Sequence, residues 1–283
     1  MFFTLRLPLF FLFFLFFLLP GALLFAQAQT ITNSIGMVFV LVEPGSMVVG
    51  RYQPTVGEYR PPVARPDAPA RRVLPESAYR KAEKMAEEAA RPGFSVTLTR
   101  PYYLGKFEVT QEQWEKVMGR NPSFFQGDEV RGNSHQHPVE NLTWKEAQTF
   151  LKELNKLEKN YHYRLPTEFE WEYAARAGAA DDIPWPMARA MAVISDTTTR
   201  PVGGKEPNAW GFYDMIGNVW EWVEDYYNEK IFADPVPPRK GKHHVLKGAS
   251  FTCDAKNATY LTHAAGPGNG FDVGLRVVLE VRK

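Results

Sequence analysis

The chain has 283 residues, with 33 basic and 32 acidic side chains and a formal net charge of +1. A nearly neutral chain of mixed charges has no reason to attract nucleic acid or an anionic membrane surface, so these partner classes are excluded. Its one cysteine, Cys253, excludes an internal disulfide, so the fold must be held by its core and by any bound metal.

Residues 1–28 have the pattern of an export signal. Arg6 precedes the apolar run LPLFFLFFLFFLLPGALLFA, and Ala26 and Ala28 supply the small residues that a signal peptidase accepts. We therefore expect a periplasmic or secreted protein without a stable membrane span after cleavage. The apolar run is also long enough to cross a membrane, so an uncleaved anchor is the alternative.

The chain before residue 110 is expected to be mostly extended. Apolar and polar residues alternate over 31–49 around Pro44-Gly45, which predicts a hairpin. Residues 50–93 start with a stretch rich in Pro and Arg and continue with helix-forming residues at 76–90 that have a weak apolar face. We interpret 50–93 as an insertion. Strand character returns at 94–110.

Three helices are predicted by one shared signature at their N-termini. Thr110, Thr143 and Thr167 are each followed three residues later by Gln or Glu, which is the spacing of a capping box. The third helix is expected to stop at Gly178. Beyond Gly178, turn-forming residues interrupt the sequence often, which indicates short strands and long loops. The fold class is therefore α+β with little regular secondary structure.

Seven segments in chain order carry a resemblance to a known family. They are VEPGSMVVG, PYYLGKFEVTQEQWEKVMG, HPVENLTWKEAQTFLKELN, YRLPTEFEWEYAARAG, PNAWGFYDMIGNVWEWVEDYY, VLKGASF and GLRVV. Together they resemble the formylglycine-generating enzyme, or sulfatase-modifying factor, family. The resemblance implies one domain over 31–283 with the insertion at about 50–93. It also implies an irregular fold similar to C-type lectins, often stabilised by calcium.

The resemblance implies a structural calcium site in the stretch DMIGNVWE. The matching ligands are the side chains of Asp214 and Glu221 and the backbone carbonyls of Gly217 and Val219. Carboxylates supplemented by carbonyls are the donors that calcium prefers. The alternative is a surface turn with two unpaired acids.

The segment KGASFTC resembles the stretch that leads to the family's first active cysteine, which makes Cys253 and Ser250 candidate catalytic residues. The second cysteine would fall at Ala258. Copper(I) prefers two thiolates, so this difference argues against formylglycine synthesis. Cys253 is interpreted either as a reactive thiol or as a buried inert residue. His263 is the third candidate catalytic residue, and the first candidates to hold copper or iron as a redox metal are His263 with Cys253, or His244.

Three functional hypotheses result, of which true formylglycine generation ranks last. Residues 254–278 resemble pyoverdine-maturation members more than sulfatase activators, because both lack the cysteine pair. The leading hypothesis is an exported metal-dependent oxidoreductase that modifies a peptide-like, aromatic or siderophore-type substrate. The alternative is a non-catalytic binding or assembly module on the same scaffold.

Overall fold

The computed structural model describes most of the chain after residue 28. The described ranges are 29–50, 93–130, 133–180, 182–183, 185–232, 235–255, 258–266 and 268–282. The export signal expected at 1–28 and the helix expected at 76–90 lie outside the described residues. The insertion expected at about 50–93 lies outside them too, apart from its two end residues.

Four α-helices and eleven strands are assigned within these ranges. The helices are α2 (Gln111–Met118), α3 (Trp144–Leu157), α4 (Glu168–Arg176) and α5 (Trp185–Met191), with 3-10 turns η1 (Gly127–Glu129) and η2 (Ser134–Gln136). The strands are β1 (Thr30–Thr32), β2 (Val38–Val42), β3 (Gly45–Val49), β4 (Phe94–Leu98), β5 (Tyr102–Gly105), β6 (Tyr161–Arg164), β7 (Trp220–Tyr226), β8 (His244–Lys247), β9 (His263–Ala265), β10 (Val273–Leu275) and β11 (Val278–Val281). Short strands and few helices confirm the α+β class.

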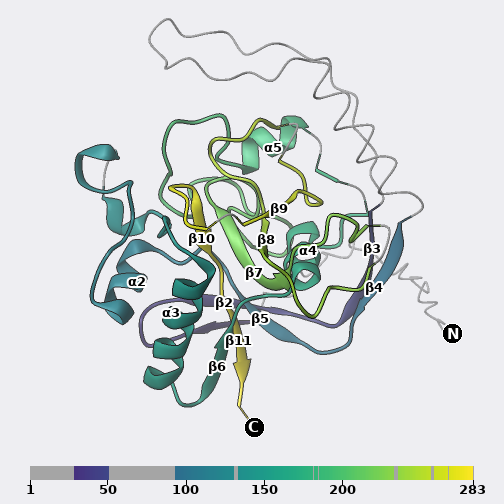
Figure 1. Ribbon diagram of the computed structural model, residues 1–283, viewed down its shortest axis with the longest axis horizontal. Coiled ribbons are helices and arrows are strands. Elements are labelled where there is room, and N and C mark those ends of the chain that lie inside the picture. The colour runs from purple at the N-terminus through teal and green to yellow at the C-terminus, as the bar shows by residue number, and fades with distance from the viewer. Residues whose placement is uncertain are drawn as a thin grey trace, which may run out of the picture.

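The strands form three sheets. One sheet has five strands in the order β1-β2-β5-β11-β6, a second has four in the order β10-β7-β8-β9, and β3 pairs with β4 in a third. All neighbours are antiparallel except β10 and β7, which are parallel. Figure 1 shows α2 and α3 to the left of β7 and β8, α4 to the right and α5 above them.

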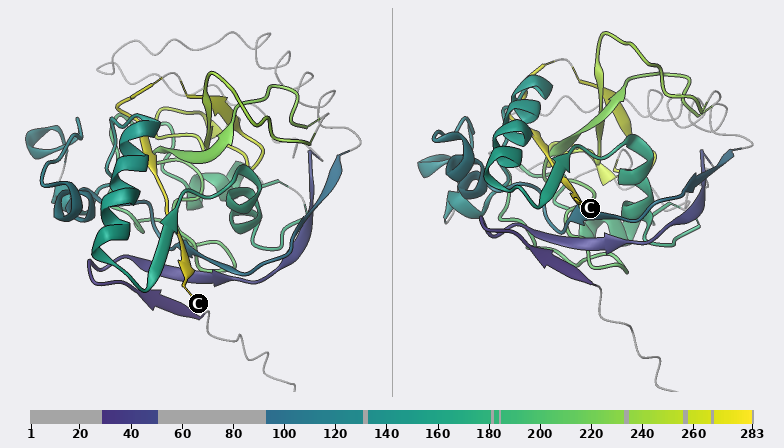
Figure 2. Two further views of the ribbon diagram at one scale, coloured as in Figure 1. Left: turned by 60° about the horizontal axis from the view of Figure 1, so that its bottom comes forward. Right: turned by 90° about the horizontal axis from the view of Figure 1, so that it is seen from below.

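The hairpin expected around Pro44-Gly45 is wrong, because the chain does not reverse there. The chain reverses earlier, between β1 and β2. There the Asn33 side chain accepts hydrogen bonds from the backbone N–H groups of Ile35 and Met37 at 3.2 and 2.9 Å. β1 and β2 pair across this turn. β2 belongs to the five-stranded sheet and β3 to the two-stranded one, and Figure 2 shows the purple ribbon running on from the first to the second. A Cβ at Gly45 would lie 2.0 Å from the Tyr173 hydroxyl, so glycine permits this close approach.

The three predicted capping boxes are confirmed. In α2, α3 and α4 the hydroxyl of the N-cap threonine accepts from the backbone of the third helical residue. That residue's side chain accepts in turn from the N-cap backbone, so two otherwise unpaired donors are satisfied at each helix start. α4 ends at Arg176, with Ala177 and Gly178 both in the left-handed region.

The core consists of two main clusters, one for each pair of helices. Residues of α2 and α3, including Trp114 and Phe150, pack with β6, β10 and β11. Residues of α4 and α5, including Trp171, pack with β5, β7 and β8. The helix α5 was not expected from the sequence, because its seven residues are too few to give a clear periodic pattern. No helix in the described part of the chain is long and apolar enough to cross a membrane.

A fully buried arginine lies where the chain passes from one large sheet to the other. Arg276 follows β10 and precedes β11. Its guanidinium donates to both oxygens of Glu221 on β7, with a shortest distance of 2.7 Å. It also donates to the carbonyls of Gly105, at the end of β5, and Tyr213. One side chain therefore ties both sheets to the loop before β7.

Arg276→Met is expected to lower the free energy of unfolding by about 3–5 kcal/mol, because it leaves the Glu221 carboxylate buried without a counter-charge. Urea denaturation measures the change. The matched control is Lys116→Met, which breaks the exposed Lys116–Glu112 pair and is expected to cost about 0.5 kcal/mol or less. Equal effects of the two substitutions would contradict the central role of Arg276.

Candidate functional site

The structure brings two of the three candidate catalytic residues together on the loop after β8. The hydroxyl of Ser250 donates to Asp272 at 2.7 Å and lies 3.8 Å from the Cys253 sulfur. Thr252 adds a second hydroxyl, 2.9 Å from that of Ser250. The chain reaches this position through a left-handed turn at Gly248 and Ala249, which have φ angles of 91° and 63°. The result is a compact group of thiol, hydroxyls and carboxylate.

The electrostatic environment keeps this thiol protonated. Burial raises the pKa of Cys253 above its ordinary value. Hydrogen bonds from Ser250 and Thr252 oppose the shift, and the nearby charge of Asp272 adds to it. Because the thiolate is the nucleophile and the metal ligand, a raised pKa makes Cys253 less reactive at neutral pH.

The position of the family's second cysteine lies inside the core. Ala258 is fully buried, and it packs in the same cluster as Trp171 and Tyr260. Cys253 borders this cluster from its partly buried position. A methyl group therefore fills the space where a second sulfur would be needed to bind copper(I).

Aromatic rings surround the loop that carries Ser250 and Cys253. Phe124 and Phe271 are 54% and 51% exposed, and they lie against the buried rings of Phe125 and Phe251. Phe251 directly follows Ser250, and Phe271 directly precedes Asp272. We call Phe124 and Phe271 the phenylalanine pair. It places two exposed apolar faces beside the polar group around Cys253.

A buried carboxyl lies beneath this region and was not identified from the sequence. Glu140 accepts a hydrogen bond from the Phe125 backbone at 2.9 Å, while its second oxygen has no hydrogen-bond partner among the described residues. Burial raises the pKa of Glu140 to about 7, and the charge of Asp272 contributes. Glu140 therefore changes its charge near neutral pH. An acid directly after the apolar Pro138-Val139 was the available sequence signal.

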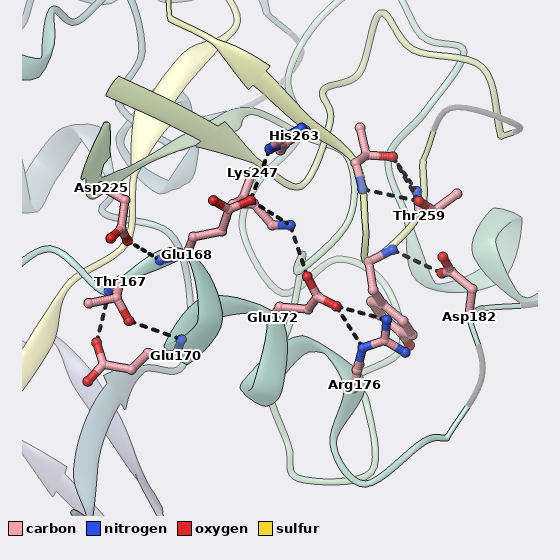
Figure 3. Close-up of polar contacts among 12 residues, drawn as sticks. Thr167, Glu168, Glu170, Glu172, Arg176, Asp182, Asp225, Lys247, Thr259 and His263 are labelled. Carbon is pink, nitrogen blue, oxygen red and sulfur yellow. Dashed lines mark hydrogen bonds and ion pairs between the residues drawn. The ribbon is translucent and has the colours of Figure 1, made fainter. Parts of the chain in front are cut away.

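The third candidate, His263, belongs to a different group of contacts. Its Nδ1 lies 3.0 Å from the Glu168 carboxylate, which is 3.8 Å from the Lys247 ammonium. Lys247 lies 3.2 Å from Glu172, which binds Arg176 at 2.8 Å. Figure 3 shows this alternating series of charges running from β9 through β8 into α4. We call it the buried ionic series.

The buried ionic series holds the Glu168 carboxyl in its ionised form. Burial by itself would raise the pKa of Glu168. The hydrogen bond from His263 and the charge of Lys247 lower the pKa, and together these interactions outweigh burial, so the net pKa is below the ordinary value. The imidazole also contacts the rings of Tyr227 and Phe232, with ring centroids 5.1 and 5.0 Å away. These contacts fit an imidazole held by packing and by a carboxylate.

A shared redox-metal site at Cys253 and His263 is not supported by these contacts. Cys253 is surrounded by hydroxyls and Asp272, whereas His263 binds Glu168. Over the described ranges, no three His, Cys, Asp or Glu residues group in a way that could hold a metal ion. The donors therefore do not fit the copper or iron expected from the sequence.

The proposed calcium ligands lie close to one another, but they already have other partners. The Glu221 carboxylate binds Arg276 and also accepts from the Trp171 indole at 2.6 Å. One oxygen of Asp214 accepts from the Gly203 backbone at 2.6 Å. A Cβ at Gly217, where φ is 84°, would lie 2.3 Å from the Val193 carbonyl, so only glycine fits this turn. The loop is thus tightly packed against the core.

This donor set fits calcium only in part. The second oxygen of Asp214 is buried and has no hydrogen-bond partner within the described residues. Asp214 is one of the residues that line a small pocket of about 10 Å³, which is room for one water-sized atom. Glu221, in contrast, would have to share oxygens that Arg276 and Trp171 already use. The calcium site at Asp214, Gly217, Val219 and Glu221 therefore stays a prediction.

A third acid near Asp214 and Glu221 was not identified from the sequence. Glu108 is buried and accepts from the Asn218 side chain and the Val219 backbone at 2.7 and 3.1 Å. Burial, with the charges of Asp214 and Glu221, raises the pKa of Glu108 well above its ordinary value. Glu108 lies more than a hundred residues before these partners in the sequence, so no local pattern could reveal the contact.

These features define a class of protein. Curled sheets of short strands, three capped helices and a Ser250–Cys253 loop after β8 are the features expected of a formylglycine-generating-enzyme-like domain. The family model described as "Sulfatase-modifying factor enzyme 1-like domain" matches residues 35–281. The chain belongs to this family.

Individual relatives agree with this assignment. The chain is 30% identical over 242 residues to a chaperone protein, LppX, of Paenibacillus barcinonensis, covering 65% of this chain and 81% of the relative. It is 34% identical over 167 residues to a formylglycine-generating enzyme of Streptomyces coelicolor, covering half of each protein. The solved structure of PvdO from Pseudomonas aeruginosa has the same fold, with a TM-score of 0.68 and 21% identity over 90% of this chain and 99% of that one.

The Cys253 thiol is expected to ionise at a higher pH than a free cysteine, because burial disfavours the thiolate. Asp272→Asn is expected to lower this pKa, because the variant removes a negative charge that opposes ionisation. Titration of the thiolate's ultraviolet absorbance measures both, with Cys253→Ser as the blank. A wild-type thiol that ionises below the range of free cysteine would contradict the geometry.

Asp214→Asn is expected to make stability less dependent on pH. Burial raises the pKa of Asp214 from 3.8 to about 6, so the folded state binds this proton more tightly than the unfolded state. Ionisation of the Asp214 carboxyl therefore lowers the free energy of unfolding as pH rises from about 4 to about 6. An asparagine at this position does not ionise, so this part of the pH dependence is lost. Denaturation of both proteins across this window measures the difference, and parallel pH profiles would argue against it.

Calcium is expected to raise the unfolding temperature at pH 7, where the Asp214 carboxyl is ionised and carries an unused oxygen. A chelator should reverse the effect, and Asp214→Ala should abolish it. Magnesium is the control, because it requires a smaller and more regular set of oxygens. An unfolding temperature that does not respond to calcium would refute the site.

Proposed function

We propose that this chain binds a peptide-like or siderophore-type substrate on the surface formed by the phenylalanine pair and the Ser250–Cys253 loop. The observation that carries the proposal is the exposure of Phe124 and Phe271 beside a group of hydroxyls, a carboxylate and a thiol. Apolar faces with a few fixed polar groups suit a ligand that has a planar or aromatic part and a polar backbone.

The geometry favours binding without catalysis over oxidation. Cys253 has no second sulfur, because Ala258 fills that position in the core. Its pKa is raised, which disfavours the thiolate that thiol chemistry or copper binding would use. This reverses the order of the first two hypotheses from the sequence, and a non-catalytic binding or assembly module becomes the first proposal.

The relatives are consistent with this order. The similarity to the chaperone LppX extends over 242 residues, whereas the similarity to the Streptomyces coelicolor formylglycine-generating enzyme extends over 167. The chain covers 81% of the chaperone but half of the enzyme. A role in holding or assembling another polypeptide outside the cytoplasm is therefore the form of binding that we propose.

An oxidoreductase remains the second proposal, because one observation favours chemistry. Glu140 has a pKa of about 7 and an oxygen that lacks a partner in the described structure, and its charge is coupled to that of Asp272 beside Ser250. A carboxyl that titrates near neutral pH can act as a general acid or base. A redox metal would have to be recruited with the substrate or with groups beyond the described residues.

Export rests on the sequence of residues 1–28, which lie outside the described structure. We propose a periplasmic or secreted location on that pattern alone. Mass spectrometry of the protein from its native host would show whether the chain starts after Ala28, and an intact N-terminus would favour the uncleaved anchor.

Binding can be tested with fluorescent hexapeptides that contain or lack a central Phe or Tyr. Aromatic peptides are expected to bind more tightly, and Phe124→Ala or Phe271→Ala should weaken them by about tenfold, the effect of losing one stacked ring. Val236→Ala is the matched control, because Val236 is an exposed apolar side chain outside the site. Equal binding by all variants would refute the proposed surface.

The two proposals differ in what happens to Cys253→Ser. A binding module retains its affinity in this variant and leaves the mass of the peptide unchanged. An oxidoreductase alters the mass of the bound substrate, and the alteration is lost in Cys253→Ser. Metal analysis of the purified protein, repeated with His263→Ala, adds an independent test, because copper or iron lost in either variant would favour the oxidoreductase.

A further inference from the structure

A large hollow lies on the far side of the segment that supports Cys253. It has a volume of about 720 Å³, and its walls are the stretch after α5, residues 192–196, and the loop 200–205. Cavities of this size are typical of sites for small molecules. No residue proposed above for substrate binding lines the hollow, so it is a separate feature.

Both walls are fixed to the core by hydrogen bonds. The backbone N–H groups of Ser195 and Asp196 donate to the carbonyls of Cys253 and Phe251 at 2.9 and 2.8 Å. On the opposite wall, the Arg200 N–H donates to the Asn218 side chain at 3.0 Å, and the Gly203 N–H donates to Asp214 at 2.6 Å. The hollow is thus held open by the fold, and its shape is set before any ligand arrives.

The lining of the hollow is basic in a chain that is almost neutral overall. Arg189, Arg200 and Lys205 line it with a single acid, Asp196. Asp196 binds Arg200 at 2.8 Å, and both Arg200 donors use the same carboxylate oxygen. In the described structure, neither Arg189 nor Lys205 forms an ion pair. The Lys205 ammonium donates to the backbone carbonyl of Arg189 at 3.4 Å, so it lies beside the Arg189 backbone at the end of α5.

We propose that this hollow binds a small polycarboxylate. One carboxylate is held by Arg189 and Lys205, and a second lies along the wall that presents the Ser195 hydroxyl and the guanidinium of Arg200. The cations of Arg189 and Lys205 form no ion pair among the described residues, although the charge of Lys205 also acts on the Asp214 carboxylate. Such cations in a preformed hollow attract an anion, and a volume of about 720 Å³ exceeds what a single phosphate fills. The proposal does not depend on the function of Cys253, because the ligand lies behind that loop.

Isothermal titration of the folded protein with citrate tests the proposal, with inorganic phosphate as the comparison. Citrate is expected to bind at one site and more tightly than phosphate. Arg189→Gln and Lys205→Gln should each weaken citrate binding by about tenfold, which is the effect of losing one charged hydrogen bond. Affinity should also fall as the salt concentration rises.

The matched control is Lys152→Gln, which removes an exposed lysine on α3, away from the hollow. Thermal unfolding of each variant shows that it is folded. Absence of citrate binding by folded wild-type protein would overturn the proposal. So would equal affinities of wild type and both lining variants, or phosphate binding as tight as citrate.

Discussion

The buried pair of Arg276 and Glu221 is the interaction on which the rest of this structure depends. Arg276 lies in the two-residue link between β10 and β11, and these strands belong to different sheets. Its donors reach one strand of each of the two large sheets and the carbonyl of Tyr213. A guanidinium suits this position, because it is planar and offers five donors in fixed directions. Arg276 therefore links the two large sheets through one buried side chain.

A second set of charges positions the other side of the same loop. Lys247 ends β8 and contacts two acids of α4, while the next residues turn into the Ser250–Cys253 segment. Charges on both sides of β7 are therefore used for structure, and over the described residues no cation pairs with the Cys253 thiol. The scaffold of a redox family is retained here, whereas the electrostatic conditions for thiol chemistry are weakened.

Local features of the fold could be predicted from the sequence, and contacts between distant segments could not. The capping boxes at Thr110, Thr143 and Thr167 depend on residues three positions apart, so the pattern alone reveals them. Ser250 and Cys253 were identified because they share one segment. His263 was grouped with Cys253 because it lies in the segment expected to form the pocket, but its partner is Glu168, 95 residues earlier. The Pro44-Gly45 pair resembles a turn, and only the nearby Tyr173 explains why the glycine serves close packing instead.

The pairing of β3 with β4 has a consequence for how this domain can diversify. Val49 and Phe94 are direct neighbours across these strands, although 44 positions separate them along the chain. The two ends of any segment inserted between Val49 and Phe94 therefore lie next to each other. The entropic cost of closing such a segment into a loop grows only slowly with its length. The connection between β3 and β4 is therefore a position where segments of different length can be inserted while the strands of the domain keep their registers.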